Sequence, residues 1–154
     1  MKLDQKKLLI SQLDKKVALF AGLKGLAIPG AGWIHAVRTA LGMSLKQLSS
    51  RLGVSPQAVK DMERREKEGA ITIQRLKEAA AALDMQLVYG FVPKEESLDK
   101  MIENRARQLA MEIVLKTAHT MRLENQEIDQ IALEDAIRKR TEKIKAELPK
   151  ALWN

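Results

Sequence analysis

The order of helix-ending and helix-starting residues in the middle of the chain constrains the fold more than any other feature of the sequence. Gly53 is followed two residues later by Ser55, and Pro56 comes directly after that serine. Glycine often ends a helix, serine can accept hydrogen bonds from the N–H groups of the next first turn, and proline suits the first helical position. Ser44 is a second serine that can cap the start of a helix. The pattern predicts short helices separated by tight turns.

Apolar residues recur at helical spacing between these turns, so each segment has one face that can be buried. The helices predicted from this periodicity cover residues 33–41, 45–52, 56–68 and, after Thr72 as a cap, 73–83. Only five of the 154 residues are aromatic, so aliphatic side chains must form the core. The predicted fold class is mainly α.

Both flanks of this region are also predicted to be helical. An amphipathic helix with Leu9 and Leu13 in its apolar stripe comes first, and a connector rich in glycine follows it. A long helix is expected after Ser97, and another from about Asp129 to Leu148. The predicted parts are an N-terminal helix and connector (1–32), a helix-turn-helix domain with a strand (33–94) and a C-terminal helical region that binds a partner (95–154).

One β-strand is predicted at residues 86–92, within MQLVYGFVP, because β-branched and aromatic residues gather there before Pro93. A lone strand leaves its backbone hydrogen-bonding groups unpaired, and no second strand candidate exists in the sequence. We therefore expect this strand to pair with its symmetry mate in a homodimer.

Several classes of function are excluded by residues that the sequence lacks. There is no cysteine, and the two histidines, His35 and His119, form no ligand cluster, so no metal site, no cofactor and no catalytic residues are expected. We therefore expect a protein that is not an enzyme. Charges interrupt every apolar run, which argues against a signal peptide or a spanning helix, and we expect a cytoplasmic protein without a membrane partner.

The positive charge of the chain is concentrated in one part. Residues 1–94 hold 16 Lys/Arg and 8 Asp/Glu, whereas residues 95–154 hold 11 and 12. A local excess of cations predicts an anionic partner, with nucleic acid first among the candidates.

The stretch GMSLKQLSSRLGVSPQAVKDME resembles the phage-repressor-like (Xre-type) helix-turn-helix family. The resemblance includes Arg38, four residues before Gly42, and Glu63 late in the second motif helix, and it implies a largely buried ion pair between the two. Leu45 departs from the family, which often places a phosphate-binding glutamine at that position. That contact must be lost or replaced.

The resemblance also implies which residues face DNA. Gln57 is the best candidate for reading a base, because its amide can form two hydrogen bonds with adenine. The candidate DNA-binding residues include the start of the second motif helix, the exposed positions of that helix and nearby cations that could contact phosphates. They are Lys46, Arg51, Ser55, Gln57, Ala58, Lys60, Asp61, Arg64 and Arg65. The alternative is that these are solvated charges on a helical module that binds protein.

A wider resemblance covers nearly the whole chain. The N-terminal helix, the stretch from PGAGWIHAVRTALG to LVYGFVP, and the tail with HTMRLENQ together look like the mobile mystery protein A family. This resemblance implies a regulator encoded next to a partner with a Fic (adenylyl-transfer) domain.

The six residues TMRLEN, from Thr120 to Asn125, fit the inhibitory pattern of Fic-controlling antitoxins: Ser/Thr, any three residues, Glu, then Gly/Asn. The resemblance implies that Glu124 pairs with a partner arginine that would otherwise hold the ATP γ-phosphate, and that Thr120 and Asn125 complete the motif. So short a pattern also arises by chance.

The sequence thus predicts an antitoxin and transcriptional regulator, a homodimer that binds operator DNA and restrains a Fic-domain, toxin-like protein encoded nearby. Two alternatives remain open. One is an autonomous repressor whose tail only dimerises, and the other is an adaptor protein that does not bind DNA.

Overall fold

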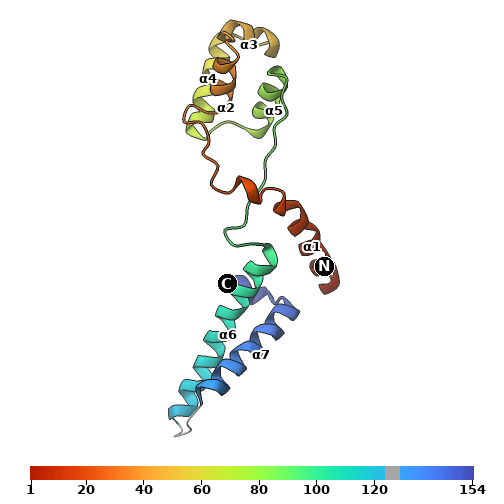
Figure 1. The fold of residues 1–154 in the computed structure, drawn as a ribbon, viewed down its shortest axis with the longest axis vertical. Helices are drawn as coiled ribbons and strands as arrows, with labels where there is room; N and C mark the ends of the chain where they lie inside the picture. The colour runs from red at the N-terminus through yellow and green to blue at the C-terminus, as the bar shows by residue number, and fades with distance from the viewer. Residues whose placement is uncertain (124–128) are drawn as a thin grey trace. The chain divides into compact units, whose positions relative to one another are not determined.

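The computed structural model describes residues 1–123 and 129–154, and this part of the chain is mainly helical, as predicted (Figure 1). The chain divides into two units: residues 25–90 form one, here the four-helix unit, and residues 1–24 with 91–154 form the other, here the tail unit. The predicted N-terminal segment 1–32 is therefore divided between them. The helices are α1 (Leu3–Ala18), α2 (Trp33–Ala40), α3 (Leu45–Leu52), α4 (Pro56–Glu68), α5 (Ile73–Ala82), α6 (Leu98–Leu123) and α7 (Gln130–Glu147), with short 3-10 helices at Ala21–Leu23 and Lys150–Trp153.

The predicted N-caps account for where the helices of the four-helix unit begin. Ser44 accepts a hydrogen bond from the backbone N–H of Gln47, whose side chain accepts one in return from the N–H of Ser44. Ser55 caps α4 and Thr72 caps α5 by the same kind of bond. Each cap satisfies a backbone donor that would otherwise have no partner in the first turn of the helix, so the helix boundaries follow from the sequence.

Small and aliphatic side chains fill the core of the four-helix unit. Leu48 of α3 and Val59 of α4 are completely buried, and Ala79 of α5 lies against them. Ile34 of α2 and Met62 of α4 complete the buried cluster together with Leu83. Burying each large aliphatic side chain contributes roughly 1.5–3 kcal/mol, so this cluster holds α2–α5 together.

The tail unit is an antiparallel pair of long helices, α6 and α7, with a core of small residues. Ala106 and Ala110 of α6 are completely buried and lie in one cluster with Ile144 of α7 and Leu152. Alanine at such positions lets helix backbones approach closely. Arg105 fixes the end of the chain on this core, donating hydrogen bonds to the carbonyl oxygens of Leu152 at 2.6 Å and Asn154 at 2.5 Å.

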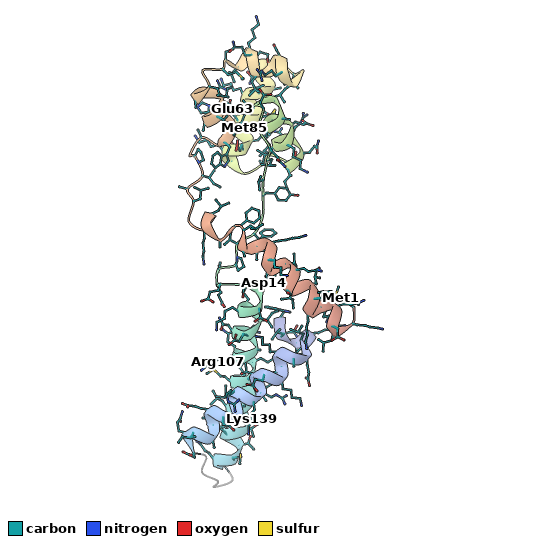
Figure 2. All side chains as sticks on the ribbon, turned by 45° about the vertical axis from the view of Figure 1, so that its right-hand side comes forward. Met1, Asp14, Glu63, Met85, Arg107 and Lys139 are labelled. Atoms are coloured by element: carbon teal, nitrogen blue, oxygen red, sulfur yellow. The ribbon has the colours of Figure 1, made fainter. Side chains whose placement is uncertain are left out.

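Helix α1 belongs to the tail unit, and only part of the predicted stripe is covered: Val17, further along that stripe, is half-buried. Leu9 and Leu13 stay exposed, whereas Ile10 packs against the tail core. Asp14, four residues after Ile10 and labelled in Figure 2, accepts hydrogen bonds from the backbone N–H groups of Leu98 at 2.7 Å and Asp99 at 3.2 Å. A carboxylate stabilises a helix N-terminus, so Asp14 joins Ser97 in capping α6.

The predicted strand at residues 86–92 is wrong, because no strand occurs in the part of the chain that the structure describes. Residues 85–93 have no regular secondary structure. Val88, Tyr89 and Phe91 are 67%, 62% and 90% exposed, and no neighbouring segment pairs with their backbone. Residues with high β-propensity favour a strand when they can pack on a half-buried sheet. The described residues contain no sheet on which residues 86–92 could pack.

Candidate nucleic-acid interface

Helices α3 and α4 meet at the turn that a helix-turn-helix requires. Gly53 ends α3 with a left-handed φ of 68°, a conformation that costs glycine little. The chain then passes through Val54 into the Ser55 cap, and Leu52 and Val54 pack on the shared core. The two helices are thus held together by a half-buried apolar corner packed on the core, which leaves the outer face of α4 exposed.

The exposed face of α4 carries the polar residues predicted to contact DNA. Gln57, Lys60 and Arg64 are exposed and recur at intervals of three and four residues, so they share one face of the helix. Ala58 and Asp61, the other predicted positions, are half-buried beside them. A helix with a row of amide and cationic side chains fits the width of a B-DNA major groove.

Asp61 engages two of the predicted DNA-binding arginines. It forms ion pairs with Arg64 and with Arg65, the second at 2.9 Å, and Arg64 also pairs with Glu68 at 2.9 Å. The hydrogen bond from Arg64 is the main reason that the pKa of Asp61 lies below its usual range. In this structure Arg64 and Arg65 are therefore occupied by carboxylates that a phosphate would have to replace.

The remaining predicted cations divide into two groups. Arg51 donates hydrogen bonds to the carbonyl oxygen of Ala82 and to Asp84, at 3.1 and 3.0 Å. Lys46 on α3 and Lys60 on α4 are exposed and have no carboxylate partner among the residues that the structure describes. Lys46 and Lys60 are thus the cations best placed to meet phosphates without giving up another contact.

Arg38 and Glu63 lie together in the interior, at the positions that the resemblance implied. Arg38 Nε donates to Glu63 Oε1 at 2.5 Å and its Nη1 donates to the carbonyl oxygen of Met43 at 2.9 Å. His35 Nδ1 lies 3.0 Å from the second oxygen of Glu63. Arg38 and Glu63 are 9% and 8% exposed, so the pair links α2 to α4 in the interior of the unit.

Glu66 has a structural role that the sequence did not indicate. Its carboxylate accepts hydrogen bonds from the backbone N–H groups of Trp33 and Ile34, both at 2.8 Å. Gly32 allows this approach, because a Cβ there would lie 2.9 Å from the Glu66 side chain. α2 has no Ser, Thr, Asp or Asn as its own N-cap, so a carboxylate from α4, more than thirty residues away, supplies the missing acceptor.

We expect Glu66→Ala to lower the free energy of unfolding by about 1–2 kcal/mol, because two N–H groups at the start of α2 lose their acceptor. The measurement is urea unfolding followed by tryptophan fluorescence in a Trp153→Phe background, where Trp33 alone reports on the four-helix unit. Glu68→Ala is the matched control, since the one ion pair that Glu68 forms in the described part of the chain is with the exposed Arg64. Equal losses in both variants would contradict the capping role.

The predicted inhibitory motif lies partly outside the described residues. Thr120 is exposed on α6 and its Oγ1 donates to the carbonyl oxygen of Lys116 at 3.1 Å. Glu124 and Asn125 fall in residues 124–128, which the structure does not describe. Among the described residues, no group of three His, Asp or Glu side chains could hold a metal ion.

A comparison with protein-family models matches residues 34–89 to the helix-turn-helix family. Searches of curated proteins and of solved structures found no match. The family match spans α2–α5 and supports the Xre-type part of the resemblance, so the four-helix unit is a helix-turn-helix domain of the class that DNA-binding transcriptional regulators carry. No helix described here is long and apolar enough to cross a membrane.

Proposed function

We propose that the protein represses transcription of its own operon by placing α4 in the major groove of an operator. The observation that carries this proposal is the exposed face of α4, where Gln57 and Lys60 lie near the N-terminus of a helix packed on the core of the unit. Helix-turn-helix proteins contact bases mainly through the N-terminal residues of this second helix.

The residues of the interface then divide by role. Gln57 reads a base, because an amide can donate to and accept from the edge of adenine. Lys46 and Lys60 contact phosphates, and Ser55 brings the start of α4 close to the backbone. Leu45 cannot replace the phosphate contact of a glutamine, so Lys46, the next residue, is the candidate to take it over.

A pair of substitutions separates these roles. We expect Gln57→Ala to relax sequence preference at one operator position, at a cost of about 1–3 kcal/mol on the operator. Lys60→Ala should weaken binding to operator and random DNA alike and reduce the slope of log K against log salt by about one. Fluorescence anisotropy with operator and scrambled duplexes at three salt concentrations measures both effects.

The outcome for Gln57 decides whether it reads a base. An equal loss on operator and scrambled DNA would remove Gln57 from base reading and leave it as a backbone contact. If the unmodified protein binds neither duplex at low salt, the chain is an adaptor and the DNA proposal fails as a whole.

Dimerisation is part of the same proposal. Helix-turn-helix regulators usually read two half-sites about one helical turn apart, so two copies are needed on one operator. Light scattering at micromolar protein concentration tests this, and a monomer on and off DNA would contradict it.

The tail unit is proposed to restrain a Fic-domain partner, which makes the protein an antitoxin as well as a regulator. The resemblance over nearly the whole chain supports this role, as does the TMRLEN motif. The near-neutral balance of residues 95–154, with 11 Lys/Arg and 12 Asp/Glu, adds further support, since such a region has no excess of cations to attract DNA. A carboxylate that pairs with the arginine for the γ-phosphate would block nucleotide binding.

Copurification tests the partner directly. The protein should retain an untagged Fic-domain protein encoded in the adjacent reading frame through repeated washes at moderate salt. A version lacking residues 95–154 is not a clean control, because α1 and α6 share one unit. The control is instead the full chain with random-sequence DNA added as competitor, which removes any protein retained only through bound DNA. Absence of the partner would favour an autonomous repressor.

A further inference from the structure

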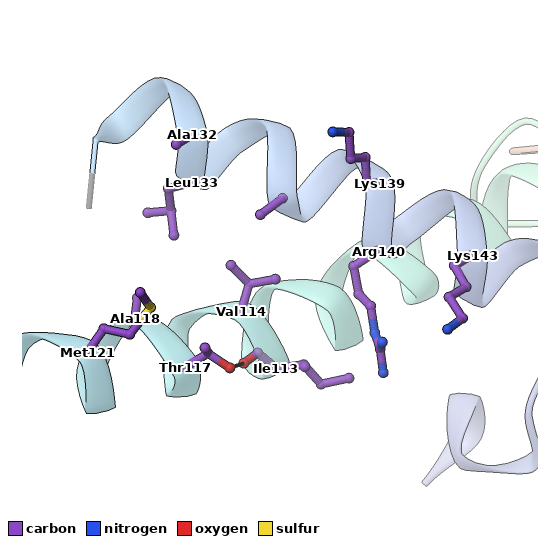
Figure 3. Close-up of a pocket in the computed structure, with 11 residues that line it drawn as sticks. Ile113, Val114, Thr117, Ala118, Met121, Ala132, Leu133, Lys139, Arg140 and Lys143 are labelled. Carbon is purple, nitrogen blue, oxygen red and sulfur yellow. Dashed lines mark hydrogen bonds between the residues drawn. The ribbon is translucent and has the colours of Figure 1, made fainter. Parts of the chain in front are cut away.

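Helices α6 and α7 leave an apolar groove along one side of the tail unit (Figure 3). Val114 and Ala118 of α6 form one wall, and Leu133 and Ala136 of α7 form the other. The groove has a volume of about 500 Å3. It extends over residues 132–143 of α7, which at 1.5 Å per residue is roughly 17 Å, or about three helical turns.

A basic rim borders the groove on the α7 side. Lys139, Arg140 and Lys143 line it, as Figure 3 shows. Lys139 pairs with Asp135 at 2.9 Å. Arg140 and Lys143 are exposed, and neither has an ion-pair partner within residues 1–123 and 129–154. The rim thus presents at least two cations beside apolar side chains.

We infer that this groove binds an acidic amphipathic helix of another protein. Two packed helices leave a depression into which the ridge of a third helix fits, and a helix laid in such a groove buries residues three and four apart. Carboxylates flanking the apolar ridge of the incoming helix would reach Arg140 and Lys143. The resulting complex is a three-helix bundle completed by the partner.

The charge of this chain argues against a second copy as the occupant. The helices that a second tail unit could offer are all net basic: α1 has four Lys/Arg and two Asp/Glu, α6 has five and three, and α7 has five and four. A second tail unit therefore offers no net acidic helix to complement the basic rim. An apolar floor equally argues against nucleic acid, which offers mainly phosphates to its protein partners.

This inference refines the partner-binding part of the proposed function and rests on the tail having a protein partner. It does not depend on adenylyl transfer or on Glu124. The groove inference and the proposed Fic inhibition can therefore fail separately. If the groove binds its helix but the protein does not inhibit adenylyl transfer, only the Fic mechanism is contradicted.

The test is selection from a displayed library of helical peptides, with leucines fixed at one face and Glu, Lys, Gln or Ala at the flanking positions, on the intact protein. We expect enrichment of Glu at the flanks and micromolar binding of the selected peptide, weakening as salt rises. Arg140→Glu/Lys143→Glu should weaken that binding at least tenfold.

Arg107→Glu/Lys116→Glu is the matched control, with the same change of charge at exposed α6 residues that do not line the groove. It should change the dissociation constant less than twofold, and circular dichroism should show both variants folded. Three outcomes would overturn the inference. The selection could enrich Lys or no sequence at the flanks, the control variant could lose binding equally, or random-sequence duplex DNA could displace the peptide.

Discussion

Arg38→Ala should lower the free energy of unfolding of the four-helix unit by about 3 kcal/mol, the usual cost of removing one partner from a buried ion pair. Within residues 1–123 and 129–154, the substitution leaves His35 as the one hydrogen-bonding side chain beside the buried Glu63 carboxylate, and it removes the donor to the carbonyl oxygen of Met43. Urea unfolding followed by Trp33 fluorescence in the Trp153→Phe background isolates this unit from the tail. DNA binding at temperatures where the variant stays folded should change little.

Arg75→Ala is the control for this prediction. Arg75 pairs with Glu78 at 2.9 Å, but both side chains are more than a third exposed, so the loss should stay under about 1 kcal/mol. An unchanged unfolding midpoint for Arg38→Ala would show that the interior pair contributes nothing to stability.

The same pair predicts how stability depends on pH. Burial raises the pKa of Glu63, but hydrogen bonds from Arg38 and His35 outweigh burial and hold the pKa below the ordinary value of 4.5. A carboxyl group whose pKa is lower in the folded state stabilises the fold above its unfolded pKa, and that contribution disappears as the pH falls through the folded pKa. Stability should therefore drop below about pH 4.5, and Arg38→Ala should flatten this drop.

Local signals in the sequence were enough to predict the four-helix unit. Ser44, Ser55 and Thr72 each fix a helix start by a hydrogen bond from a backbone N–H three positions later. Both partners of each bond are therefore close together in the sequence. The second helix of the motif also follows from local periodicity. Which positions of α4 are exposed was implied by the resemblance and not by periodicity: Gln57, Lys60 and Arg64 are exposed, whereas Ala58 and Asp61 are half-buried.

Contacts between distant residues could not be predicted in the same way. Glu66 caps a helix more than thirty residues earlier, and Asp14 caps one more than eighty residues later. The strand at 86–92 failed for a related reason, because β-propensity becomes a strand only when a partner is present. The resemblance implies that Asp61 faces DNA, whereas its ion pairs with Arg64 and Arg65 depend on side-chain geometry that the sequence does not contain.

Glu124→Ala should raise adenylyl transfer by the complex with the proposed Fic partner at least tenfold. If the Glu124 carboxylate pairs with the partner arginine, removing the carboxylate frees that arginine to bind the γ-phosphate. Cationic contacts of this kind contribute several kcal/mol to transition-state stabilisation in phosphoryl transfer. The assay is radiolabel transfer from ATP with each variant in stoichiometric excess over the partner. Operator binding should be unaffected, since the helix-turn-helix domain belongs to the other unit.

The control for Glu124 is Glu127→Ala, which removes the same charge three positions later and should leave inhibition intact. Complex formation should also persist in both variants, because a single carboxylate contributes little beside an extended apolar interface. This distinction matters for the groove between α6 and α7: Arg140→Glu/Lys143→Glu should weaken the complex itself, whereas Glu124→Ala should release activity within an intact complex. If Glu124→Ala restrains the partner as well as the unmodified protein does, the motif is a chance match, and any restraint must come from docking alone.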